Sequence, residues 1–262
     1  MEGCMIYRHI ATSERAFVQQ LAVAYVNHGY WYYVTGTIPP HKDAIKVDDK
    51  LLARYDVAIS KWAKARRKRQ GLANVQYLRH GHFFVLIATR GLHPFFEQEG
   101  DNVKDVRREP IRFAGYSIGY RMGVDRKWHP SVRIHPVEYN GLKSFYLDLA
   151  TRSSIEHLLR EFRRIPFEPY AAVRRQLLNV LRAVNRARKA AGFELLPVSA
   201  LRLRRRAVKA FDQGEEDTLQ RAALASGIGL SDSGCKLSLR ALAVGIPQED
   251  GATPRGLPRC SA

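Results

Sequence analysis

The fold is indicated most directly by residues 60–89, SKWAKARRKRQGLANVQYLRHGHFFVLIAT. Ser60 can cap a helix that carries six Lys or Arg side chains before Gly71 ends it. Two runs rich in β-branched and aromatic residues then flank His80-Gly81, a tight loop in which glycine supplies a positive φ. The stretch therefore predicts a strongly basic helix followed by a β-hairpin.

Capping residues and hydrophobic patterns extend this prediction toward the N-terminus. The expected elements are a helix capped by Thr12 or Ser13 and ended by Gly29, a buried strand 30–38, a short helix capped by Asp48 or Asp49, the basic helix 60–71, and hairpin strands 74–79 and 82–89. Helices and antiparallel strands in this order predict an α+β protein.

Over residues 12–90, this order of helix, strand, helix, turn, basic helix and hairpin resembles that of winged-helix DNA-binding proteins. The resemblance implies that the third helix enters the major groove and that the hairpin contacts the adjacent DNA backbone. The first strand, 30–38, is longer and more aromatic than that pattern requires, and the loop after it is long.

The composition points to a polyanionic partner. The 262 residues carry a formal net charge of +18, and 45% of them are hydrophobic, so the chain has enough apolar side chains for a folded core. Uncompensated positive charge destabilises a compact chain unless phosphates neutralise it. We therefore expect a nucleic-acid partner, with DNA favoured over RNA.

The basic helix is predicted to pack through one side only. At 100° per residue, one side of the helix carries Trp62, Ala63 and Ala65. The opposite arc carries Lys61, Lys64, Arg67 and Lys68. This arc is expected to face water or phosphate.

A second basic helix is predicted from Val173 to Ala191. Its apolar positions form one stripe, and no acidic residue occurs within it. Four cations share a narrow arc on the opposite side: Arg175, Arg182, Arg186 and Lys189. A solvent-exposed helix face usually mixes acidic and basic residues, so this arc predicts contact with a phosphate backbone.

The cations of both helices, of the hairpin and of the segment after Pro197 make up the predicted nucleic-acid interface. Its members are Lys61, Lys64, Arg66, Arg67, Lys68, Arg69, Arg79, His80, His82, Arg175, Arg182, Arg186, Lys189, Arg202, Arg204, Arg205 and Arg206. The binding protein implied by this interface fits replication initiation, a mobile-element accessory role or transcriptional regulation. No cofactor is expected for such a binding protein, and a homodimer is compatible with such a role.

A catalytic alternative rests on His80-Gly-His82. Two histidines around one residue, near a strand, resemble the metal-binding pair of rolling-circle replication endonucleases. The resemblance implies that His80 and His82 would bind Mg²⁺ or Mn²⁺ and that a tyrosine such as Tyr170 would attack a phosphodiester, as in a transposase. The intervening glycine and the position at a hairpin tip depart from that pattern. A binding protein is therefore favoured over an enzyme.

A third alternative is a module for single-stranded DNA or RNA. Aromatic side chains could form a platform on which bases stack. The candidates are Tyr30, Trp31, Tyr32, Tyr33, Tyr77, Phe83 and Phe84. Because these residues lie on strands that must bury at least one face, a role in the core is the competing prediction.

The acidic residues of the loop 91–110 allow two interpretations. Glu97, Glu99, Asp101 and Asp105 could hold Mg²⁺, or they could pair with Lys104, Arg107 and Arg108. Ion pairs are favoured, because mixed charge runs normally face water.

Four regions are predicted along the chain. They are a winged-helix-like unit at 1–91, a short β-rich connecting region with one helix at 92–150, a basic helical region at 151–212, and a mostly disordered tail at 213–262. The tail holds five Lys or Arg and six Asp or Glu residues, so almost all the positive charge precedes it.

Neither a membrane nor a zinc site is predicted. No apolar run approaches the roughly 18 residues that span a bilayer, and the N-terminus lacks a charged and then apolar leader. The three cysteines are scattered and have no CxxC spacing. A cytoplasmic, nucleoid-associated protein with free thiols is expected.

Overall fold

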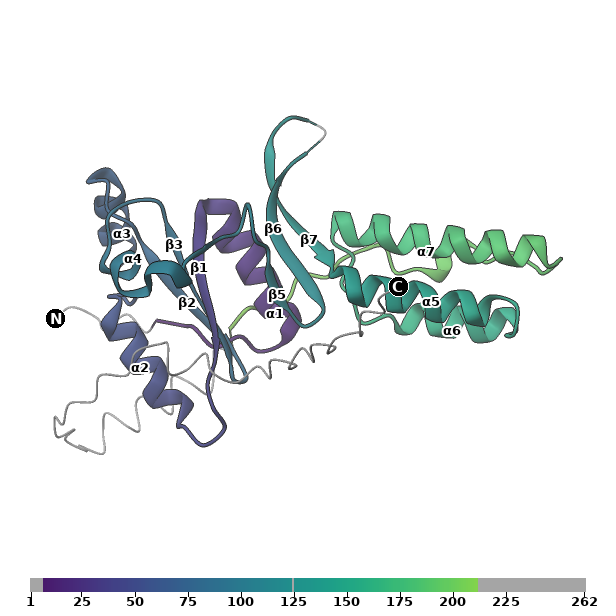
Figure 1. Cartoon of the computed structure of the whole chain (residues 1–262), viewed down its shortest axis with the longest axis horizontal. Coiled ribbons are helices and arrows are strands. Elements are labelled where there is room, and N and C mark those ends of the chain that lie inside the picture. The colour runs from purple at the N-terminus through teal and green to yellow at the C-terminus, as the bar shows by residue number, and fades with distance from the viewer. Residues whose placement is uncertain (1–6, 124, 212–262) are drawn as a thin grey trace, which may run out of the picture.

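The computed structural model describes residues 7–123 and 125–211 (Figure 1). Helices and two antiparallel sheets follow one another along this part of the chain. The predicted α+β class is therefore confirmed. The tail predicted at 213–262 lies outside the described residues.

The first helical segment begins and ends where its capping residues predict. α1 (Glu14–Gln19) starts at Ser13, whose hydroxyl accepts a backbone N–H at 3.2 Å. The segment continues through a π-helical turn, η1 (Gln20–Tyr25), and a 3₁₀ turn, η2 (Val26–His28). Gly29 then adopts a left-handed φ of 91°, which glycine tolerates without strain.

Four strands form the first sheet in the order β2-β3-β1-β4, with every neighbouring pair antiparallel. They are β1 (Tyr30–Thr37), β2 (Val75–His80), β3 (Phe83–Thr89) and β4 (Lys104–Asp105). The predicted β2–β3 hairpin is confirmed. Because His80 pairs with Phe83, its loop is Gly81-His82, one residue later than predicted.

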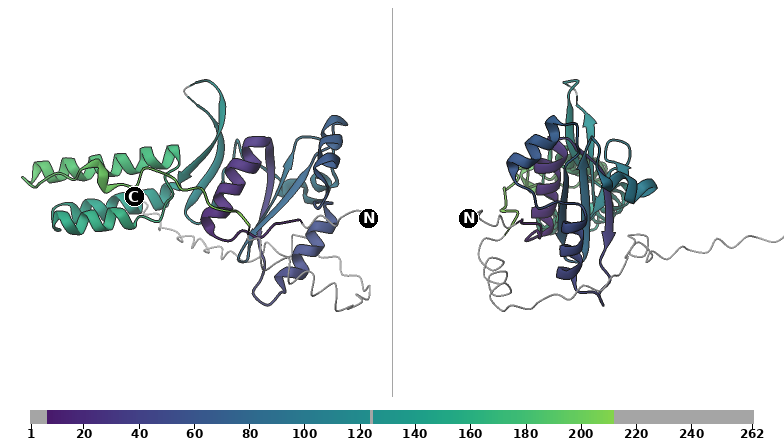
Figure 2. Two further views of the ribbon diagram at one scale, coloured as in Figure 1. Left: turned by 180° about the vertical axis from the view of Figure 1, so that it is seen from behind. Right: turned by 90° about the vertical axis from the view of Figure 1, so that its left-hand side faces the viewer.

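α1 and η1 cover one face of this sheet (Figures 1 and 2). Phe17 and Leu21 lie in the same buried cluster as Tyr33, Leu78 and Val85. Side chains alternate across a strand, so the neighbours of these three strand residues point to the opposite face.

That opposite face is covered by α2 (Ala44–Arg54) and α4 (Pro94–Glu99), and the turn η3 (Gly100–Asn102) follows α4. Tyr77 and Phe84 of the sheet pack there with Phe95 of α4. The cap predicted for α2 is wrong. Asp43 accepts the capping N–H at 3.0 Å, whereas Asp48 lies one turn inside the helix and is buried.

The helices before the hairpin are thus divided between the two faces of the sheet. α3 (Lys61–Arg69) follows α2 and contains no buried residue. The order of elements predicted for residues 12–90 is present, but α1 and α2 pack on opposite faces. These helices therefore do not form one bundle in front of the hairpin.

A second sheet of three antiparallel strands has the order β5-β6-β7. Its strands are β5 (Ile111–Phe113), β6 (Tyr116–Met122) and β7 (Trp128–Ile134). Ile118 and Val132 join the buried cluster that contains Phe17, so this sheet packs against the segment formed by α1 and η1.

Three helices project from the second sheet and lie alongside one another (Figures 1 and 2). They are α5 (Pro136–Ala150), α6 (Ile155–Arg164) and α7 (Ala171–Ala190), and the short turn η4 (Val198–Ala200) comes after them. Gln176 attaches α7 to the edge of β7 through two hydrogen bonds with the backbone of Ile134, at 2.9 and 3.0 Å. The second basic helix is confirmed.

The segment after η4 returns to the first helix. Gln19 donates to the carbonyl of Val208 at 2.7 Å and accepts from its N–H at 3.2 Å. One buried cluster contains both Ala11 and Leu201, so the two ends of the described chain share a core.

Candidate nucleic-acid interface

The packing side predicted for α3 is wrong. Trp62, at the centre of the predicted packing side, is 86% exposed. Arg66 and Arg69 are also exposed, and helical periodicity places both on the side of Trp62. The outward face of α3 therefore combines an indole ring with two guanidinium groups.

Lys64 and Arg67 face inward and are half-buried. The Lys64 ammonium lies 5.4 Å from the centre of the Tyr7 ring, and burial lowers the pKa of Lys64. Arg67 forms an ion pair with Asp56. Asn74 donates to the Lys64 carbonyl at 3.0 Å. Long cationic side chains can pack their methylene groups while their charged ends find partners, which explains this orientation.

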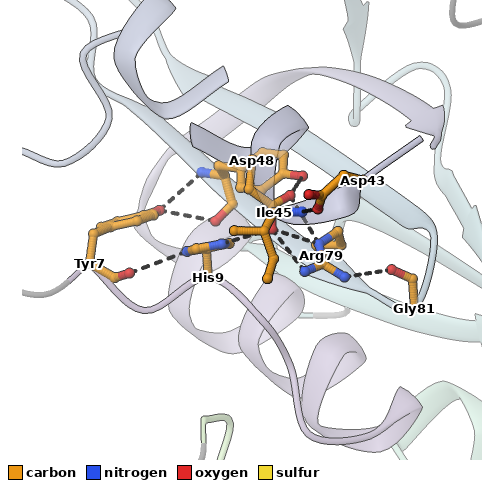
Figure 3. Close-up of polar contacts among 8 residues, drawn as sticks. Tyr7, His9, Asp43, Ile45, Asp48, Arg79 and Gly81 are labelled. Atoms are coloured by element: carbon orange, nitrogen blue, oxygen red, sulfur yellow. Dashed lines mark hydrogen bonds and ion pairs between the residues drawn. The ribbon is translucent and has the colours of Figure 1, made fainter. Parts of the chain in front are cut away.

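Arg79 is not available for the backbone contact predicted for it. It is 8% exposed and holds Asp48, which is 1% exposed, through bonds of 2.8 and 2.9 Å (Figure 3). His9 approaches the same carboxylate at 3.0 Å, and Tyr77 donates to it from the sheet. Arg79 also donates to the carbonyl of Gly81 at 2.7 Å, which ties the hairpin loop to α2.

The Asp48 carboxylate is ionised within this network. Burial alone would raise the pKa of Asp48, but its hydrogen bonds with His9, Arg79 and Tyr77 together hold that pKa below its usual value. Arg79 and Asp48 therefore form a structural ion pair that joins β2 to α2.

The two histidines of the hairpin have different environments. His80 lies 3.0 Å from the carbonyl of Ala11 and packs edge-on against Phe113. His82 is exposed in the loop. Tyr170 packs instead beside Tyr116 and Arg205. Among the described residues, no hydrogen bond or ring contact joins Tyr170 to either histidine.

The basic arc of α7 is exposed as predicted. We call Arg175, Arg182, Arg186 and Lys189 the basic stripe; all four side chains are exposed. The opposite side of α7 is buried through Val173, Leu177, Val180, Leu181 and Val184. The stripe also borders a pocket of about 660 Å³ between α5 and α7, to which Lys143 adds a further cation.

A second pocket, of about 480 Å³, lies at the N-terminal end of α7. Five arginines line it, and we call it the arginine pocket: Arg121, Arg133, Arg174, Arg175 and Arg205. These come from β6, β7, α7 and the segment after η4. Arg175 belongs to both surfaces, so the stripe runs into the pocket.

The strand register explains why two of these arginines lie on the same face of the hairpin. Arg121 pairs with His129, and Ser117 pairs with Arg133, across β6 and β7. Both pairs alternate with the core pair of Ile118 and Val132, so they lie on the opposite face of the hairpin. Sequence reasoning missed Arg121, Arg133 and Arg174. The available signal was an arginine adjacent to core positions of a strand. Only the strand register shows which of these arginines share a face.

The arginine pocket carries an excess of positive charge, although its lining residue His129 pairs with Asp125 at 2.8 Å. The described residues that line it include no Asp or Glu. The pKa of Arg133 lies below its usual value. Partial desolvation is the largest cause, and repulsion from Arg121 and Arg175 adds to it. The hydrogen bonds formed by Arg133 and Arg174 go to neutral groups, the Ser131 hydroxyl at 3.2 Å and the Leu203 carbonyl at 3.4 Å.

Tyr170 also lines the arginine pocket, where the Arg205 guanidinium lies 5.0 Å from its ring centre. Burial raises the pKa of the Tyr170 hydroxyl, although its hydrogen bond with Arg205 acts in the opposite direction.

Of the other predicted cations after Pro197, Arg202 forms an ion pair of 2.7 Å with Glu168. Arg204 and Arg206 are exposed.

The aromatic residues and the acidic loop mostly have structural roles. Tyr33, Tyr77 and Phe84 are buried, which confirms their prediction as core residues. Asp105 pairs with Arg107 at 2.6 Å, which confirms one of the predicted ion pairs. Glu99 is buried and accepts a hydrogen bond from the Tyr55 hydroxyl.

Comparisons with protein-family models, with curated proteins and with solved structures gave no match. None of the helices in residues 7–123 and 125–211 has the length and hydropathy that crossing a membrane requires. Within the same ranges, no three His, Cys, Asp or Glu side chains lie close enough together to hold a metal ion.

Proposed function

We propose that this protein binds DNA through the basic stripe of α7 and the adjoining arginine pocket. The observation that carries the proposal is a continuous set of exposed cations that no described carboxylate neutralises. Among the described residues, none of the ion pairs involves a member of the stripe. Phosphates are the usual partners of such a surface.

The dimensions of the stripe suit a nucleic-acid backbone. From Arg175 to Lys189 the helix rises about 21 Å, at about 1.5 Å per residue. Phosphates of one DNA strand recur about every 3.4 Å along the duplex axis, so the stripe extends along about six of them. Replication initiation, a mobile-element accessory role and transcriptional regulation are processes that this binding would serve.

Removing three cations of the stripe tests the proposal. The combined variant Arg182→Ala, Arg186→Ala, Lys189→Ala is expected to bind duplex DNA more weakly than the parent. Its slope of log affinity against log salt should fall by about 0.9 for each phosphate that the variant no longer neutralises, or about 2.7 in all. Fluorescence anisotropy over a salt series measures both quantities, with single-stranded DNA and structured RNA as competitors.

A charge-matched control separates phosphate binding from general electrostatics. The combined variant Arg152→Ala, Arg160→Ala, Arg163→Ala removes the same charge from exposed positions outside both basic surfaces. It should keep the parental salt slope. Equal affinities and slopes for the parent and the stripe variant would show that α7 does not contact DNA.

Single-stranded nucleic acid is a second candidate ligand, supported by the exposed face of α3. An indole that is 86% exposed and lies between cationic side chains suits stacking on an unpaired base. Trp62→Ala is expected to weaken binding of single-stranded DNA by about 1–3 kcal/mol and to leave duplex binding unchanged.

Titrations of both DNA forms with Trp62→Ala measure this effect. Ile45→Ala is the matched control, because Ile45 is an exposed apolar residue of another helix. A Trp62→Ala protein that binds single strands as tightly as the parent would exclude stacking on α3.

A further inference from the structure

The arginine pocket differs from the basic stripe in its shape. The stripe is an open helix face, whereas the pocket is a concave site whose arginines come from β6, β7, α7 and the segment after η4. Its volume of about 480 Å³ lies within the range of small-ligand sites, which is roughly 300–1,000 Å³. A backbone passing along an open surface does not need such a cavity, but a group at the end of a strand can enter it.

The β6–β7 hairpin lies at the end of the stripe where the pocket is found. Figure 1 shows this hairpin rising beside the beginning of α7. Both arms of the hairpin contribute an arginine to the pocket, and Arg175 is the last stripe residue before it. A strand that follows the stripe toward the N-terminus of α7 therefore meets the hairpin and the cavity together.

The N-terminus of α7 adds partial positive charge to the same cavity. Ala171 and Ala172, the first residues of this 20-residue helix, line the pocket. Tyr170 precedes them and makes no side-chain capping bond. The first N–H groups of a helix lack intrahelical partners and favour an anion. They supplement the arginines, which carry the main charge.

The amount of charge distinguishes a strand end from a strand interior. An internal phosphodiester carries one negative charge, whereas a phosphomonoester carries about 1.5–2 negative charges at neutral pH and offers three acceptor oxygens. Guanidinium groups bind such oxygens in pairs of parallel hydrogen bonds. Five arginines with no described carboxylate among them match the more highly charged group.

We infer that the arginine pocket holds the terminal phosphomonoester of a DNA strand whose backbone lies along the basic stripe. The inference rests on the proposed DNA binding and specifies which part of the ligand enters the pocket. It predicts a preference for one phosphorylated end, which the stripe alone would not produce.

The test compares one short DNA oligonucleotide carrying a 5′-phosphate, a 3′-phosphate or hydroxyls at both ends. The parent should bind one phosphorylated form about tenfold more tightly than the hydroxyl form, a difference of about 1.4 kcal/mol. The combined variant Arg121→Ala, Arg133→Ala should weaken binding of the phosphorylated form more than binding of the hydroxyl form, so that the tenfold ratio between the two falls to about one. Arg121→Lys, Arg133→Lys keeps the charge without paired bonds and should recover only part of the preference.

The combined variant Arg152→Ala, Arg163→Ala is the charge-matched control and should keep the full preference. Thermal unfolding of each variant shows whether the fold is intact. If the parent binds all three oligonucleotides equally well, the inference is wrong while DNA binding stands. If none of them binds, the proposed function fails as well.

Free nucleotide is the other source of a phosphomonoester. A nucleoside monophosphate should compete with the phosphorylated oligonucleotide only weakly, because it lacks the backbone that contacts the stripe. Competition by the nucleoside monophosphate at the affinity of the oligonucleotide would identify a nucleotide site and overturn the inference of a strand end.

Discussion

Asp48→Ala is expected to lower the free energy of unfolding by about 3–5 kcal/mol, which is the usual cost of removing one partner from a buried ion pair. The substitution would leave the Arg79 guanidinium buried without its counter-charge, and His9 and Tyr77 would lose an acceptor. These groups come from α2, the hairpin and the segment before α1, so the loss affects the packing of all three on the α2 face of the first sheet (Figure 3). Chemical denaturation monitored by circular dichroism measures the change.

The neighbouring residue provides a matched control. Asp49 is exposed on the same helix, so Asp49→Ala should change the free energy of unfolding by about 0.5 kcal/mol or less. Equal effects of the two substitutions would show that the network contributes no more than an ordinary surface carboxylate.

The same network predicts how stability depends on pH. Because the folded-state pKa of Asp48 lies below its usual value, ionised Asp48 stabilises the fold above about pH 4, and this contribution is lost as the pH falls through the folded pKa. Asp48→Asn should therefore be less stable than the parent at neutral pH, with the difference shrinking in acid. A difference that does not depend on pH would show that the carboxylate charge is not the stabilising feature.

Arg188→Ala is expected to lower the free energy of unfolding by about 3 kcal/mol, from the loss of charged hydrogen bonds inside the protein. Arg188 is 2% exposed although it lies on α7 among exposed cations. It donates to the carbonyls of Glu194 at 2.6 Å, Ala150 at 2.8 Å and Ser153 at 3.2 Å. Ala150 ends α5, where carbonyl groups carry partial negative charge, so Arg188 ties α5 to α7.

Arg186 provides the control for Arg188. It is exposed on the same helix, so Arg186→Ala should leave thermal and chemical unfolding almost unchanged while it weakens DNA binding. Arg188→Ala should show a lower unfolding midpoint by circular dichroism. If Arg188→Ala unfolds like the parent, the three carbonyls do not depend on this guanidinium.

Much of the secondary structure could be predicted because its signals are local. Ser13 and Gly29 limit the first helical segment through capping and a left-handed turn, and these requirements involve only nearby backbone. The β2–β3 hairpin has a glycine in its loop for the same kind of reason. The cap of α2 could not be assigned in this way, since Asp43 and Asp48 are both chemically suitable and only packing distinguishes them.

The candidate site could be predicted in part. The exposed stripe of α7 follows from helical periodicity, because its apolar side is continuous and must be buried. The orientation of α3 does not follow, because this short helix has no comparable apolar side and its packing depends on Tyr7, Asp56 and Asn74. Arg79 resembles a surface cation in the sequence, and only the fold places Asp48 beside it.

The amino-acid sequence alone determined the excess of positive charge, the α+β class and most helix and strand positions, because these depend on composition and on short-range backbone chemistry. The tertiary structure decided which cations have acceptors inside the protein and which line an exposed surface. Arg79 and Arg188 are held by buried acceptors, whereas Arg121, Arg133 and Arg175 converge in a pocket that no described carboxylate lines. The physical reason is that ion pairing and burial depend on distances between residues far apart in the chain.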